Sequence, residues 1–212
     1  MQIRFIVTVA TMLLTVCSVW AASPKVIQVE VEDNHVANWN RFAVNIYNLH
    51  MKQIAGKETR QTVMTGEYGG LAAEGIFYKE TTYHDANTGL LLSRVRADRD
   101  KPEIRHSVEA FVYNGQGRLV RDFAALYLPW SQNAPMNTVI NLHSYKADLH
   151  AYRQFNATGD IIYEQCKGVM SGAKVDISLE MYQIRPPITE TGAYQACFAG
   201  AAKAAGVYLI PQ

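Results

Sequence analysis

Hydrophobic positions near the start of the chain recur at the spacing of a helix. Polar residues occupy the opposite side, Asp33 or Asn34 can cap the start, and Gly56 follows the end. The pattern predicts an amphipathic helix over residues 36–55 that packs one apolar face on the rest of the domain. The apolar positions of that face are Val36, Trp39, Phe42, Ala43, Ile46 and Leu49.

The middle of the chain changes to the pattern of β-strands. From residue 74 to 184, short alternating or apolar runs rich in Tyr, Phe, Val and Ile are separated by turn residues, which favours antiparallel strands. Turns at 85–89, 114–117 and 156–159 each combine Asn or Asp with a glycine after an aromatic strand end. Because these residues adopt turn dihedrals readily, the turns predict tight hairpins. Their unequal spacing favours a meander over a repeat protein.

A second helix is expected near the C-terminus. Pro186 and Pro187 end the last strand, and Thr189 or Thr191 can cap a helix that ends at Gly206. The residues that would face inward are Tyr194, Cys197, Phe198, Ala201 and Ala205.

The first 21 residues have the organisation of a cleavable signal peptide. Arg4 precedes an apolar run over 5–16, and Val19 and Ala21 place branched or small side chains at the two positions that a signal peptidase inspects. The run is shorter than the ~20 residues needed to cross a bilayer, and no later segment is long and apolar enough to span one. We therefore expect a periplasmic or secreted protein with no transmembrane segment after cleavage.

The mature part, residues 22–212, is expected to form a single domain, since about 190 residues bury one sizeable core. Loss of Arg4 lowers the basic residues from 20 to 19 against 19 acidic ones, so the formal charge becomes zero. Nucleic-acid binding is not expected, because the basic residues are scattered among acidic ones and form no basic face. Cys17 leaves a lipid anchor as the alternative to a free N-terminus.

Two cysteines remain after cleavage, and an even pair in an exported chain is typical of a disulfide. Cys166 and Cys197 are 197 − 166 = 31 positions apart, have no C-x-x-C spacing and have no histidine close by. This pattern favours a structural bridge over a redox or metal pair. A loop of this length predicts a stabilisation of about 3–4 kcal/mol.

Together these elements predict an α+β fold. We expect a curved antiparallel β-meander sheet of about six to nine strands. The N-terminal amphipathic helix packs on this sheet, and the disulfide clamps the C-terminal helix to it. A curved sheet of this kind can leave a cavity for a ligand.

The longest charge-free stretch is the main hint of a binding site. No Asp, Glu, Lys or Arg occurs in the 23 residues from 123 to 145. A buried strand followed by a covered loop accounts for it without any function. The rival interpretation is a binding surface formed by Tyr127, Trp130 and His143, because a Trp on a loop often contacts a partner or covers a ligand cavity.

The sequence carries no signature of a particular reaction. It has no G-x-S-x-G elbow, no H-E-x-x-H helix, no phosphate-binding glycine loop and no haem-attachment motif. His143 and His150 are seven positions apart, which places them on opposite faces of a continuous strand, and a turn near Lys146 is needed to bring them together. We therefore expect no bound metal and no cofactor.

These observations favour a non-catalytic periplasmic binding or accessory protein. Its apolar pocket or loop near Tyr127, Trp130 and His143 would take a small apolar ligand or an envelope protein partner. One alternative is an exported enzyme whose polar groups converge only in three dimensions, which predicts ionisable groups with shifted pKa values. The other is a structural subunit of an envelope assembly, which predicts a large exposed aromatic patch.

Overall fold

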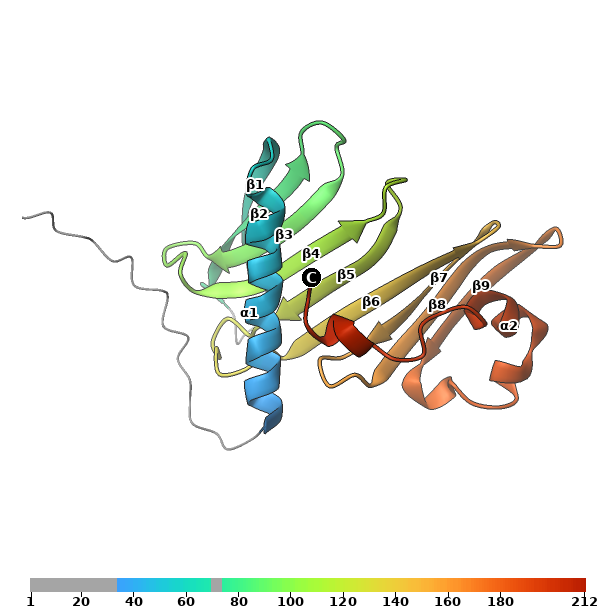
Figure 1. The fold of residues 1–212 in the computed structure, drawn as a ribbon. Helices are drawn as coiled ribbons and strands as arrows, with labels where there is room; N and C mark the ends of the chain where they lie inside the picture. The colour runs from blue at the N-terminus through green and yellow to red at the C-terminus, as the bar shows by residue number, and fades with distance from the viewer. Residues whose placement is uncertain (1–33, 70–73) are drawn as a thin grey trace, which may run out of the picture.

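The computed structural model of the protein describes residues 34–69 and 74–212. A long helix lies across one face of a broad antiparallel sheet, and a short helix covers the far end of the same face (Figure 1). Residues 1–21, the expected signal peptide, lie outside the described residues. The elements are α1 (Asn34–Ile54), β1 (Thr59–Glu67), β2 (Phe77–Asp85), β3 (Leu91–Asp98), β4 (Arg105–Tyr113), β5 (Leu119–Leu126), β6 (Asn137–Lys146), β7 (Leu149–Phe155), β8 (Ile161–Met170), β9 (Ala173–Glu180) and α2 (Gly192–Phe198).

The sheet is the expected meander. Its nine strands are hydrogen-bonded in chain order, and β1 and β9 do not pair with each other, so the sheet is not closed. The three predicted hairpin turns join β2 to β3, β4 to β5 and β7 to β8. Gly89, Gly117 and Gly159 have φ values of 72°, 73° and 92° there, a conformation that glycine adopts without a steric penalty. The turn chemistry of the sequence therefore sets the hairpins locally.

The core between α1 and the sheet confirms the predicted amphipathic helix. Phe42, Ile46 and Leu49 of α1 are buried, with exposed fractions of 7% or less. They pack on the central strands, where Phe123 and Ile140 are fully buried. The helix ends two residues before Gly56, whose φ of 70° suits the chain reversal that follows. Burial of this face, rather than helix propensity alone, holds α1 on the sheet.

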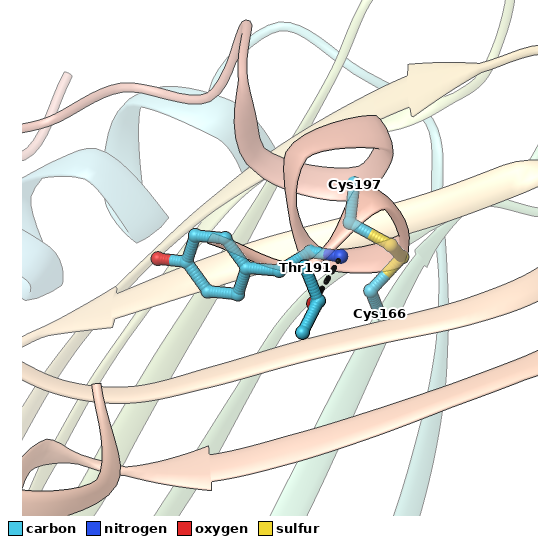
Figure 2. The surroundings of a disulfide bond; sticks show 4 residues. Cys166, Thr191 and Cys197 are labelled. Carbon is cyan, nitrogen blue, oxygen red and sulfur yellow. Dashed lines mark hydrogen bonds between the residues drawn. A yellow bond between two sulfur atoms is a disulfide. The ribbon is translucent and has the colours of Figure 1, made fainter. Parts of the chain in front are cut away.

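A second core lies under α2, at the β7–β9 end of the sheet. Thr191 caps α2, because its side chain accepts a hydrogen bond from the backbone N–H of Tyr194, and Cys197 forms a disulfide with Cys166 of β8 (Figure 2). The disulfide and the Thr191 cap are therefore confirmed. After α2 the chain returns across the sheet, and Arg121 of β5 donates two hydrogen bonds to the carbonyl oxygen of Gln212.

The predicted length of the C-terminal helix is wrong. Helix α2 ends at Phe198, whereas the sequence pattern predicted a helix reaching Gly206. Gly200 lowers the helix propensity there, and the carbonyl of Ala202 accepts a hydrogen bond from Arg153 of β7 rather than from a following turn of helix. The side chains expected on the inward face are nevertheless buried: Tyr194, Cys197, Phe198, Ala201 and Ala205.

No helix in the parts of the chain that the structure describes has the length and apolar character needed to cross a membrane.

Candidate functional site

The two faces of the sheet differ in character. On β5 and β6, alternate residues such as Phe123 and Leu142 are buried against the α1 side. Because successive side chains of a strand point to opposite faces, Asp122 and His143 belong to the other face, which no described helix covers. We call this second surface the open face. It carries polar and aromatic side chains on β5–β8.

The structure places the three sequence-predicted site residues on different surfaces. Tyr127 lies on the α1 side, where it packs against the core and its hydroxyl donates a hydrogen bond of 3.0 Å to Oδ1 of Asn40. Burial raises the pKa of Tyr127 to about 12. His143 lies on the open face, so the structure does not bring Tyr127 and His143 together.

Trp130 lies in the loop between β5 and β6, and 53% of its surface is exposed. The loop is held close to the start of β6. Pro135 is fully buried, and Asn40 of α1 donates a hydrogen bond of 2.7 Å to the carbonyl oxygen of Asn133. The charge-free stretch therefore supplies most of β6, whose alternate residues are buried, and a loop that presents Trp130 to solvent. The binding role of this loop stays a prediction.

The most organised polar group on the open face is a chain of three side chains. Oδ2 of Asp122 lies 2.6 Å from Nε2 of His143, and Nδ1 of His143 lies 2.9 Å from Nε2 of His150. The side chain of His143 is 6% exposed and that of Asp122 is 14% exposed. His150 is exposed. The chain therefore leads from a shielded carboxylate to an imidazole at the surface.

Two amide side chains hold the carboxylate of Asp122 in place. Gln154 of β7 donates to the side-chain oxygen of Asn141 at 3.0 Å, and Asn141 of β6 donates to Oδ1 of Asp122 at 2.8 Å. As a carboxylate, Asp122 can only accept, so Nε2 of His143 carries the hydrogen that it receives. When His143 is neutral, its Nδ1 accepts a hydrogen bond from Nε2 of His150, and when His143 is protonated, Nδ1 donates to His150 instead.

Aromatic rings surround the two imidazoles. The ring of Tyr145 is nearly parallel to His150, with centroids 4.6 Å apart and planes 5° apart. Tyr152 lies 5.3 Å from the ring of His143. Partial burial of the His150 ring, and then the charge of His143, lower the pKa of His150. A neutral His150 is therefore favoured.

A hairpin brings His143 and His150 together. Strands β6 and β7 are joined by a tight turn in which Lys146 pairs with Leu149 and Ala147 has a φ of 50°. The turn near Lys146, which the sequence offered as the way to unite the two histidines, is thus confirmed. Sequence reasoning missed Asp122 as their partner, although this residue marks the start of the charge-free stretch.

A second group of charges on the sheet is paired internally. Arg96 of β3 contacts Glu80 of β2 at 2.6 Å, and Arg94 contacts Glu109 of β4 at 3.1 Å. Adjacent opposite charges across strands stabilise a sheet. We therefore assign this group a structural role and take the Asp122–His143–His150 chain as the candidate site.

The Asp122–His143–His150 chain can do two kinds of chemistry, because an imidazole oriented by a carboxylate can transfer a proton or bind a metal ion. Among the described residues, no set of three or more His, Cys, Asp and Glu side chains is arranged to hold a metal ion.

Comparison of the amino-acid sequence and the structure with protein-family profiles, with curated proteins and with solved structures finds no match.

Proposed function

We propose that the protein is an exported, non-catalytic binding or accessory protein whose ligand binds on the open face around His143. The observation that supports this most directly is the Asp122–His143–His150 chain. Its members come from three adjacent strands, so a rigid scaffold sets their positions, as binding constellations require. The export part of the proposal depends on residues 1–21. The Cys166–Cys197 disulfide supports it, since such bonds persist in oxidising compartments.

The structure favours the open face over the α1 side for a small ligand. The α1 side is occupied by core side chains such as Ile46 and Phe123, which are fully buried. The open face offers the exposed imidazole of His150 beside the partly exposed ring of Tyr145. Trp130 offers a separate contact surface on its loop, which suits a protein partner better than a small ligand because one exposed ring encloses little of a small molecule.

Mass spectrometry of the protein from its own cell envelope tests this function. The full chain is expressed with its leader and purified without reduction, and native and denaturing spectra are then compared. The denaturing mass should correspond to a chain that starts at Ala22 and lacks the two thiol hydrogens of Cys166 and Cys197. The native spectrum should carry an additional mass that is absent after His143→Ala and retained after Trp130→Ala.

The variants locate the site as well as test the function. Loss of the additional mass in Trp130→Ala alone would move the site to the loop. A wild-type protein with no additional native mass would reject small-ligand binding, and a lipid-sized covalent increment would favour the alternative of a lipid anchor at Cys17.

A second candidate function is proton transfer in an enzyme, which the hydrogen-bond chain itself favours. Asp122 orients His143, and His143 can receive a proton from His150 at the surface, as a relay to a general base would. This candidate predicts turnover of a small ester or phosphoester by the wild-type protein, with a loss of about 10²–10⁴-fold in Asp122→Asn. Wild-type turnover no faster than that of His143→Ala would remove it.

A further inference from the structure

We infer that His143 and His150 form a binding site for a divalent transition-metal ion, with Cu(II) as the preferred ion. The inference builds on the proposed binding function and names its ligand. The sequence predicts no metal site, because a spacing of seven places the two histidines on opposite faces of a continuous strand. The β6–β7 hairpin removes that objection, since it places both imidazoles on the open face.

The separation of the two nitrogens suits adjacent positions around one ion. Nδ1 of His143 and Nε2 of His150 are 2.9 Å apart. This separation is that of a hydrogen bond and changes when the His150 ring turns; metal–imidazole bonds of about 2.0–2.1 Å place two nitrogens about 2.9–3.4 Å apart around one ion, so a small movement of His150 is sufficient. Square-planar or tetragonal coordination by nitrogen and oxygen is typical of Cu(II) and Ni(II), and Cu(II) has the highest affinity among divalent first-row ions.

Asp122 has the position of an outer-shell partner. Metal-binding histidines usually donate their second ring N–H to a carboxylate, which fixes the tautomer and makes the free nitrogen a stronger donor to the metal. The pair of Asp122 and Nε2 of His143 has this arrangement, with a separation of 2.6 Å. Asn141 holds the carboxylate from the other side. Nδ1 of His143 is therefore already presented as a ligand.

Binding requires a change at His150. The two rings now meet at their edges, with centroids 5.1 Å apart and planes 19° apart, and share the proton on Nε2 of His150. When the metal binds, that proton moves to Nδ1 of the same ring by exchange with solvent, and the ring turns so that both lone pairs point to the ion. His143 stays in place because its side chain is 6% exposed and bonded to Asp122. His150 is exposed and can turn.

The charges around the site set its strength. The carboxylate of Asp122 offsets one charge of a divalent ion. Lys167 of β8 lies directly opposite His150 in the sheet register, and Arg118 lies over the ring of Tyr145. Both cations oppose metal binding, so Lys167→Gln should tighten it. With two protein ligands, the other coordination positions of the ion are left for solvent or for a donor group of a partner.

The test is a titration of the full, non-reduced protein with Cu(II) alone after treatment with a chelator. We expect one equivalent to bind, with an electron paramagnetic resonance spectrum that shows coupling to two imidazole nitrogens. His150→Ala should lose one nitrogen and most of the affinity. Because His150 is exposed, this variant should fold as the wild type does, and circular dichroism checks its fold.

Asp122→Asn separates an outer-shell role from a ligand role. It should weaken Cu(II) binding by about 10–100-fold while both nitrogen couplings remain. His84→Ala, which removes a histidine of β2, is the matched control and should bind as the wild type does. Wild-type protein without a two-nitrogen signal, or a His150→Ala variant that binds unchanged, would overturn the inference.

The two proposals fail in different ways. If the native spectrum shows an organic ligand that is lost in His143→Ala, and the copper titration shows no two-nitrogen site, the binding function is supported and the metal site is rejected. A wild-type protein with no native ligand of any kind and no two-nitrogen signal would remove both.

Discussion

The buried ion pair between Arg153 of β7 and Glu164 of β8 controls how the C-terminal segment is held. The Arg153 side chain is 7% exposed and that of Glu164 is 0% exposed. Arg153 also donates a hydrogen bond of 2.6 Å to the carbonyl oxygen of Ala202, and the hydroxyl of Tyr194 donates one of 3.2 Å to Oε1 of Glu164. Oε2 of Glu164 has no hydrogen-bond partner among the described residues.

Replacing one member of this pair should cost much more than replacing both. Arg153→Met leaves a buried carboxylate without its counter-charge, for which we expect a loss of about 3–5 kcal/mol in the free energy of unfolding. For a domain of this size, a loss of 1 kcal/mol lowers the melting temperature by about 2–4 °C, so the midpoint should fall by about 6–20 °C. The double variant Arg153→Met, Glu164→Met should be close to wild type, because replacing a buried pair by apolar residues is often neutral.

Urea unfolding followed by circular dichroism, with the disulfide intact, measures these differences. Tyr194→Phe supplies an intermediate point, since a hydrogen bond to a charged group contributes about 1.5–3 kcal/mol. A loss below about 1 kcal/mol in Arg153→Met would refute the reasoning, because it would mean that solvent reaches the carboxylate of Glu164. A double variant as unstable as the single one would show that packing, rather than charge, dominates.

Three further predictions concern stability. Replacing Cys166 and Cys197 together with Ala should lower the free energy of unfolding by about 3–4 kcal/mol, and an unchanged urea midpoint without reductant would contradict the clamp. Gly168 of β8 has a φ of 148°, and an added Cβ would overlap a backbone carbonyl oxygen of the β6–β7 turn. Gly168→Ala should therefore lose more than about 2 kcal/mol, whereas Gly192→Ala, where a Cβ meets open space, should change by less than about 0.5 kcal/mol. Burial, and then the charge of Arg105, lower the pKa of His50 in the folded protein. As the pH falls, His50 therefore takes up a proton more readily in the unfolded chain, and the free energy of unfolding decreases below about pH 6.5. Urea unfolding of His50→Gln and the wild type at about pH 7.5 and about pH 5.5 checks this, and an equal loss in both proteins would exclude His50 as the cause.

The sequence by itself determined the elements whose signals are local. The three- and four-residue spacing of Phe42, Ile46 and Leu49 identifies α1, because side chains at that spacing share one helix face. The Asn, Asp and Gly turns identify three hairpins, because turn dihedrals depend on the residues in the turn itself. The Cys166–Cys197 bridge follows from counting, since two cysteines remain after the expected cleavage and only one intramolecular pairing exists.

Tertiary structure decided the composition of the candidate site. Asp122, His143 and His150 meet only because the registers of β5, β6 and β7 place them diagonally on one face, and register depends on long-range pairing that no local pattern encodes.

Long-range contacts also surround the C-terminal segment and separate the predicted site residues. Helix α2 ends at Phe198, and Arg153 of β7 binds the carbonyl oxygen of Ala202 within the segment that was predicted to be helical. Tyr127 and His143 were grouped by one charge-free stretch, but Tyr127, directly after β5, contacts α1, whereas His143 of β6 points to the open face. Contacts between residues far apart in sequence depend on how the strands between them pair, and in this protein the nine-stranded sheet sets that pairing.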